Sequence, residues 1–300
     1  MRALANLGLG VVLGLGVPGA RAQTVTPTPE TGVTPNVLLL YSAETVPGRE
    51  MDYSRKEAEI AASYEEKKIP VYWLAMTSLT GTPRVLYFEG FDSFGDVETT
   101  EGVIRDVLAT RSDIVGMQQE LLSYLNGSHT VLAFRRDDLG YRMNKADLAK
   151  ARYVRVTQVQ LKTGTDADFA EAVKTVRHFY ETNDVDAPWV IYQVDSGMAM
   201  PAYLQIQPMQ SLKEMDDAYD RAKNSPVVPA GSVRQKLIQA LQSSLATAEA
   251  ETYSVSLKMS HLAPEARAGK KSEGERGDKG QARPGTGKKS AAVGGRSNRK

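Results

Sequence analysis

Three histidines and no cysteine define the nucleophilic and metal-binding chemistry that this chain offers. His178 is the most informative, because a histidine beside a cavity can act as a general base or as an axial ligand of haem iron. Val173 belongs to the apolar stripe of the predicted helix, and His178 lies about 140° from it at 100° per residue, so we expect His178 on the surface. His129 and His261 fall at loop positions, where we expect solvated side chains.

Aromatic residues of the predicted strands are the second group that offers chemistry. A tyrosine hydroxyl or a tryptophan N–H in a mostly apolar cavity can orient a small, flat ligand. The candidates for lining such a cavity are Trp73, Tyr87, Trp189, Tyr192 and Tyr203. An alternative that stays open is that these rings only fill the space between two sheets.

The sequence lacks the motifs of several other kinds of site. No pair of histidines has metal-ligand spacing, and the acidic clusters at 214–217 and 137–138 lack the glycine of a calcium loop, so we interpret them as solvated faces. No glycine-rich phosphate loop opens a helix, and no Gly-x-Ser-x-Gly elbow is present. We therefore predict no metal site and expect no cofactor, and whether the chain is an enzyme stays open.

The elements that position these residues occur twice. A shift of about 116 to 122 residues brings apolar and turn positions of one half onto those of the other, which favours a tandem duplication. Among the matched pairs are Gly48 with Gly164, Tyr64 with Tyr180 and Pro83 with Pro201. Other matched positions have diverged, namely Trp73 with Ile191, Val71 with Trp189 and Glu89 with Gln207. A ligand site in either half is therefore expected to differ from the other.

Each half is predicted to contain a strand, an amphipathic helix, a β-hairpin, a second amphipathic helix and a final strand. That order, β-α-β-β-α-β, is the ferredoxin-like arrangement. The first strands are expected at 37–41 and 153–161, the second helices along 114–125 and 233–245, and the last strands at 130–135 and 252–259.

This order of elements resembles the dimeric α+β barrel superfamily, which includes antibiotic-biosynthesis monooxygenases and chlorite dismutases. The stretches 188–194 (PWVIYQV) and 207–215 (QPMQSLKEM) are similar to segments of uncharacterised exported bacterial proteins with this fold. The resemblance covers 36–142 and 152–262 and implies an α+β fold, in which the two repeats pack as an intramolecular barrel. It transfers no catalytic residue, because function depends on sites and not on folds.

The ends of the chain differ from its body. Residues 1–22 have the basic start, short apolar run and Ala-x-Ala end of a secretory signal peptide, so we expect export to the periplasm or the extracellular space. Residues 23–35 form a Thr/Pro-rich linker, and 143–151 form a second linker between the repeats. Residues 263–300 carry eleven Lys or Arg against four Asp or Glu, which predicts a disordered basic tail.

Composition limits the function. The net charge of +1 averages an acidic body of about −8 at 23–262 with the tail, and specific nucleic-acid binding is not expected. The leading hypothesis is an exported, non-catalytic protein that binds a small apolar or aromatic ligand. The alternatives are an oxidoreductase, either cofactor-independent and monooxygenase-like or haem-dependent through His178, and a protein that contacts an anionic surface through its tail. No transmembrane span is expected after removal of the signal, and the oligomeric state is not predicted.

Overall fold

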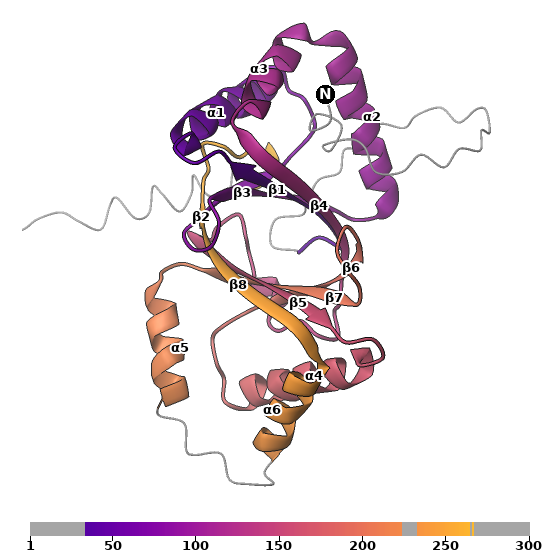
Figure 1. The fold of residues 1–300 in the computed structure, drawn as a ribbon, viewed down its shortest axis with the longest axis vertical. Helices are drawn as coiled ribbons and strands as arrows, with labels where there is room; N and C mark the ends of the chain where they lie inside the picture. Colours follow the sequence, from indigo (N-terminus) through magenta and orange to yellow (C-terminus); the bar gives the residue numbers. More distant parts are fainter. Residues whose placement is uncertain (1–33, 224–232, 265, 267–300) are drawn as a thin grey trace, which may run out of the picture.

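The computed structural model describes residues 34–223, 233–264 and 266. The predicted signal peptide, nearly all of the first linker and nearly all of the basic tail lie outside these residues. The described part contains eight strands in one closed barrel and six α-helices outside it (Figure 1). None of the described helices is long and apolar enough to cross a membrane.

Both halves have the same order of elements. The first half contains β1 (Val37–Thr45), α1 (Glu50–Glu66), β2 (Leu74–Ser78), β3 (Arg84–Phe91), α2 (Phe94–Thr110), α3 (Ser112–Leu122) and β4 (Leu125–Arg135). A 3-10 helix, η1 (Met143–Lys145), follows. The second half contains β5 (Tyr153–Leu161), α4 (Asp166–Thr182), β6 (Val190–Ser196), β7 (Ala202–Met209), α5 (Lys213–Lys223), α6 (Val233–Ser244) and β8 (Leu245–Val255).

The barrel consists of two four-stranded sheets joined at both edges. Its strand order is β1-β3-β2-β8-β5-β7-β6-β4, so each half contributes four consecutive strands. Antiparallel pairing of β2 with β8 and of β4 with β6 closes the two seams. The predicted hairpins are confirmed as β2–β3 and β6–β7. Figure 1 shows α1 to α3 over the first sheet and α4 to α6 over the second.

Alternation along the strands creates three separate cores, because successive side chains of a strand point to opposite faces of its sheet. In β3, Leu86 and Phe88 point into the barrel, whereas Val85 and Tyr87 pack beneath the helices of the first half. The barrel interior contains side chains from all eight strands. The predicted linker at 143–151 also contributes to this interior through Ala146 and Ala151.

The structure corrects several of the predicted elements. Two helices precede the last strand in each half, and the first of each pair, α2 and α5, was not predicted. Helix α2 is separate from α3 because Arg111 between them has a non-helical backbone. Leu125 and Leu245, placed on helical stripes, begin strands instead. The last strand ends at Val255 and not at residue 259. With the additional helix, each half has the order β-α-β-β-α-α-β.

Candidate functional site

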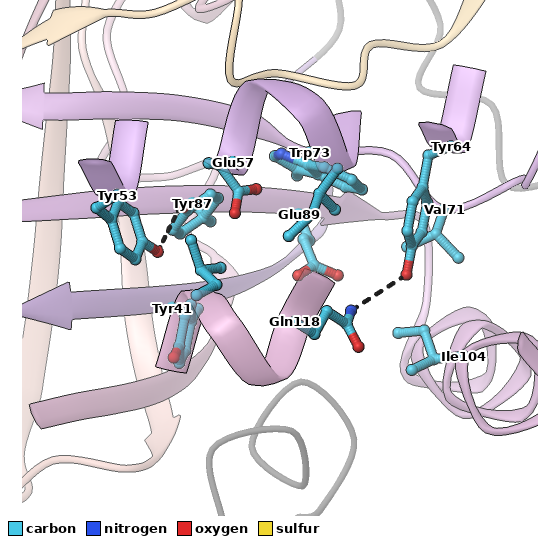
Figure 2. Close-up of a pocket in the computed structure, with 12 residues that line it drawn as sticks. Tyr41, Tyr53, Glu57, Tyr64, Val71, Trp73, Tyr87, Glu89, Ile104 and Gln118 are labelled. Carbon is cyan, nitrogen blue, oxygen red and sulfur yellow. Dashed lines mark hydrogen bonds between the residues drawn. The ribbon is translucent and has the colours of Figure 1, made fainter. Parts of the chain in front are cut away.

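A cavity of about 60 Å³ lies between the first sheet and its helices (Figure 2). We call it the first-half pocket. The side chains that line it come from β1, α1, β3, α2, α3 and the segment before β2. They are Tyr41, Tyr53, Glu57, Ile60, Tyr64, Val71, Trp73, Tyr87, Glu89, Ile104, Gln118 and Leu121. The pocket thus combines apolar and aromatic walls with two carboxyl groups and one amide.

The helix α1 places its pocket residues by their spacing. Tyr53, Glu57, Ile60 and Tyr64 recur at intervals of three and four, which puts all of them on the face of the helix that covers the sheet. All four side chains are buried. Glu57 therefore occupies a core position of an otherwise apolar and aromatic stripe.

Strand β3 supplies the second carboxyl group by alternation. Tyr87 and Glu89 are two residues apart, so both side chains point to the helical side of the sheet. Glu89 is 3% exposed and Glu57 is 5% exposed. Burial in these surroundings raises the pKa of Glu57 to about 8, and the neighbouring Tyr87 hydroxyl offsets part of the effect. The pKa of Glu89 is also raised to about 8, first by burial and then by the negative charge of Glu101.

Tyrosine hydroxyls provide the other polar atoms of the pocket. The oxygens of Tyr53 and Tyr87 lie 2.6 Å apart and share a hydrogen bond. Burial, together with the charge of Glu57, raises the pKa of both well above the ordinary tyrosine value, so both are neutral near pH 7. Gln118 Nε2 donates a long hydrogen bond of 3.5 Å to the Tyr64 hydroxyl. Its other polar atom, Oε1, is buried without a protein partner.

Trp73 is held in the wall by the segment that follows β8. Its indole Nε1 donates to the Met259 carbonyl at 2.7 Å, and its backbone forms an antiparallel bridge with His261. The His261 ring lies 2.6 Å from the Val71 carbonyl oxygen through Nδ1 and 3.3 Å from the Glu65 carboxylate through Nε2. The prediction that His261 is solvated is therefore wrong, since this side chain is only 3% exposed. Its contact with the Val71 carbonyl joins residues that are 190 positions apart in the sequence.

The five aromatic candidates fall in three places. Trp73 and Tyr87 line the first-half pocket. Tyr192 points into the barrel interior, and its hydroxyl donates to the Pro35 carbonyl at 3.0 Å. Trp189 and Tyr203 belong to the core beneath the second-half helices. The space between the two sheets, where the sequence placed a ligand cavity, is occupied by packed side chains, and the pocket lies outside the barrel.

The second half lacks the carboxyl groups of the first. Helices α1 and α4 both have 17 residues, and their alignment places Val173 at the position of Glu57. In the strands, Gln207 takes the position of Glu89. The two halves therefore differ at both positions that carry the carboxyl groups of the first-half pocket.

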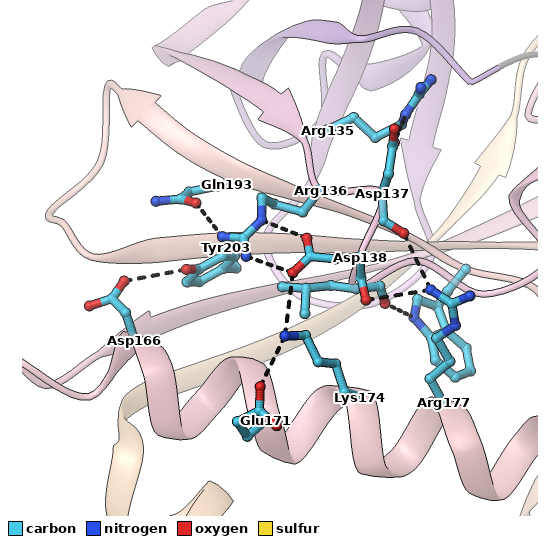
Figure 3. Close-up of polar contacts among 12 residues, drawn as sticks. Arg135, Arg136, Asp137, Asp138, Asp166, Glu171, Lys174, Arg177, Gln193 and Tyr203 are labelled. Carbon is cyan, nitrogen blue, oxygen red and sulfur yellow. Dashed lines mark hydrogen bonds and ion pairs between the residues drawn. The ribbon is translucent and has the colours of Figure 1, made fainter.

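A cluster of ion pairs and hydrogen bonds lies beside α4 in the second half (Figure 3). Arg136 binds both carboxylate oxygens of Asp138, at 2.8 and 2.9 Å, and also donates to Gln193 at 2.7 Å. The Tyr203 hydroxyl donates to Asp166 at 3.3 Å. These groups satisfy one another, so this cluster has the character of a structural network.

His178 does not join either group. It is exposed on α4, as the sequence predicted, and His129 is exposed on β4. Among the described residues, no group of three His, Cys, Asp or Glu side chains is placed to hold a metal ion. The first-half pocket does not fit haem, since its 60 Å³ are fewer than the about 150 Å³ of a cavity that holds benzene, and no described residue that lines it is a histidine.

Glu57 was not among the residues predicted to line a site, and Glu89 was predicted only as a difference between the halves. A signal for both was present. Glu57 continues the stripe of Tyr53, Ile60 and Tyr64, and Glu89 shares the alternation of Tyr87. A charged residue at a position that both patterns assign to the core is the mark of a buried titratable group.

Comparisons with known proteins give structural similarity only. No protein-family model and no curated protein matches the chain. A monooxygenase-like protein from Lactobacillus acidophilus is 12% identical, with a TM-score of 0.46 over 73% of this chain and 93% of that one. An anthrone oxidase-like protein is 13% identical, with a TM-score of 0.48 over 75% and 93%. The chlorite dismutase of Candidatus Nitrospira defluvii is 10% identical, with a TM-score of 0.43 over 77% and 93%.

These similar structures are of the monooxygenase-like and chlorite dismutase-like kinds that the sequence resemblance named. The identities reported above are 13% or less, and the TM-scores are all below 0.5. What the chain does must therefore be inferred from the residues of the first-half pocket.

Proposed function

We propose that this chain binds a small organic molecule in the first-half pocket. The observation that carries the proposal is the pair of buried carboxyl groups, Glu57 and Glu89, beside the unpartnered Oε1 of Gln118. A buried polar group without a partner costs about 1–3 kcal/mol. The second half uses Val173 and Gln207 in place of the two glutamates, so this architecture packs without them. A ligand that pairs with these groups explains why they are there.

The size of the cavity restricts the ligand. At roughly 30 Å³ per water molecule in the liquid, the 60 Å³ available corresponds to about two waters. A cavity that holds benzene measures about 150 Å³, so a single aromatic ring enters only if side chains move. The ligand that fits the pocket as it stands has only a few non-hydrogen atoms.

Tryptophan fluorescence tests the proposal, because Trp73 lines the pocket and Trp189 lies beneath the second-half helices. In a Trp189→Phe variant, we expect a saturable change in Trp73 emission on titration with at least one member of a panel. The panel contains 1-propanol, propylamine, propionate and phenol. A Trp73→Phe variant, which reports Trp189 alone, should respond to none of them. A panel without any saturable response from Trp73 contradicts the proposal.

A second candidate function is proton transfer, as in a cofactor-independent oxidoreductase. The observation that favours it is the pKa of about 8 for Glu57, which is close to neutral pH, where a carboxylate accepts protons efficiently. Glu57 would take a proton from a bound weak acid of a few non-hydrogen atoms, which leaves a neutral glutamic acid and the conjugate base of the ligand. The binding proposal does not depend on this step.

Further proposals come from the sequence alone. We propose that the chain is exported, on the basis of the signal-like residues 1–22, and that the basic segment 263–300 contacts an anionic surface. We also propose that the halves arose by duplication of a ferredoxin-like unit. Support for this comes from the positive φ of Gly48 and Gly164 at the same turn of each half.

A further inference from the structure

Three polar groups of the first-half pocket, the carboxyl groups of Glu57 and Glu89 and the amide oxygen of Gln118, are hydrogen-bond acceptors once the carboxyl groups are ionised. Glu57 comes from α1, Glu89 from β3 and Gln118 from α3, and Figure 2 shows their polar ends between the Tyr53–Tyr87 pair and Tyr64. Among the described residues that line the pocket, none is a lysine, an arginine or a histidine. The pocket therefore lacks a positive charge that would balance its carboxylates.

Aromatic rings surround these acceptors. Tyr64 and Trp73 meet edge to face, with centroids 5.1 Å apart and an interplanar angle of 80°. Tyr41 and Tyr87 are tilted by 38°, with centroids 5.7 Å apart. The face of an aromatic ring carries negative potential and attracts cations, most strongly when water is excluded.

The neighbours of each carboxyl group add no compensating charge. The charge of Glu57 raises the pKa of four tyrosines, Tyr41, Tyr53, Tyr64 and Tyr87. All four are therefore neutral at pH 7. The charge of Glu101 raises the pKa of Glu89, and the charge of Arg105 lowers the pKa of Glu101. When both glutamates are ionised, a cationic ligand would therefore meet two negative charges and the negative faces of aromatic rings inside the pocket.

We propose that the ligand of the first-half pocket is a small aliphatic amine in its protonated form. An ammonium group has three N–H donors and no acceptor, which matches the carboxylates of Glu57 and Glu89 and the free Oε1 of Gln118. Its alkyl carbons would contact the tyrosine and tryptophan rings. This inference rests on the proposed function and names the chemical class of its ligand.

Other small ligands match the pocket less well. An anion such as propionate would be repelled by the carboxylates. An alcohol of the same shape offers one donor and no charge. A bare metal ion would lose its hydration shell to a wall that is mostly aromatic and apolar. Charge and donor number therefore both favour an ammonium group.

Calorimetric titration of the full chain with propylamine, 1-propanol and propionate tests the inference. We expect propylamine to bind at least tenfold more tightly than 1-propanol at pH 8, and propionate not to bind. Amine affinity should rise about tenfold between pH 6 and pH 7 for each carboxyl group that must ionise, and flatten above pH 8. The reason is that a carboxyl group with a pKa of about 8 must lose its proton to pair with the ammonium ion. Binding should release protons to the buffer.

Substitutions separate this role from general packing. Glu57→Gln and Glu89→Gln should each reduce amine affinity at least tenfold at pH 8 and reduce the affinity for 1-propanol much less. Glu59→Gln is the matched control, since Glu59 lies on the same helix, is exposed and pairs with Lys56. It should leave the amine affinity unchanged.

The outcomes distinguish the two proposals. If 1-propanol or phenol binds in the pocket and propylamine binds no better, the amine inference is wrong and the proposed function stands. If amine affinity is independent of pH, or unaffected by Glu57→Gln and Glu89→Gln, the inference is also overturned. If no member of the panel binds, both proposals fail.

Discussion

At pH 8, the free energy of unfolding of the double variant Glu57→Gln/Glu89→Gln is expected to exceed that of the natural chain by several kcal/mol. Each carboxyl group has a pKa of about 8 in the folded chain, against an ordinary value of 4.5. Between these values the unfolded chain binds fewer protons than the folded one, so stability falls as pH rises and levels off above pH 8. At about 1.4 kcal/mol per pKa unit, each ionised glutamate lowers the free energy of unfolding by up to roughly 5 kcal/mol. Below pH 4.5 this penalty is absent.

Urea unfolding at pH 5, 6.5 and 8 measures this effect. The variant should gain little at pH 5 and most at pH 8, because glutamine has nearly the shape of a protonated glutamic acid. Glu59→Gln, at an exposed position of α1, should follow the natural chain at every pH. If natural chain and double variant lose stability in parallel from pH 5 to pH 8, the two carboxyl groups are not buried as described.

Leu204→Ala is expected to destabilise both halves of the protein together, by about 2–5 kcal/mol. Leu204 lies on β7, is 0% exposed and belongs to the barrel interior. That interior joins side chains of the first sheet, such as Leu38 and Leu86, to those of the second. A cavity on one side therefore weakens the packing of both sheets.

The two tryptophans again report the two halves separately. With Leu204→Ala placed in the Trp189→Phe and the Trp73→Phe backgrounds, the urea midpoints of the two proteins should fall together. Leu79→Ala, at a side chain that is 50% exposed, should shift either midpoint very little. A midpoint that falls for Trp189 but not for Trp73 would mean that the halves unfold independently.

Local pattern was sufficient for most of the fold. The apolar strands and the hairpin turns at Gly81 and Gly197 follow from residue type and alternation, and both glycines have positive φ. Helix α2 was not predicted because it buries only Thr100, Ile104 and Val107, which form a weak apolar pattern over 17 residues. Leu125 and Leu245 were misassigned because a single apolar residue at a helix-to-strand junction fits either period.

The candidate site was only partly predictable. Trp73 and Tyr87 were named from residue type, but their partners Glu57 and Glu89 are of a type that is usually exposed. Whether a strand residue faces the barrel or the helices decides its role, and Tyr192 and Tyr203 lie on opposite faces although both are buried. The burial of His261 depends on the chain returning to Trp73 after β8, which no local pattern contains.

The position of the ligand is the most direct test of the first-half pocket. We would label the tyrosine rings with ¹³C and titrate the full chain with the tightest-binding member of the panel, following the ring signals by NMR. The signals of Tyr41, Tyr53, Tyr64 and Tyr87, which line the pocket, should shift and saturate together. The signals of Tyr192 and Tyr203 should stay in place. Shifts at Tyr192 or Tyr203 without shifts at the four pocket tyrosines would place the ligand elsewhere and contradict the proposed site.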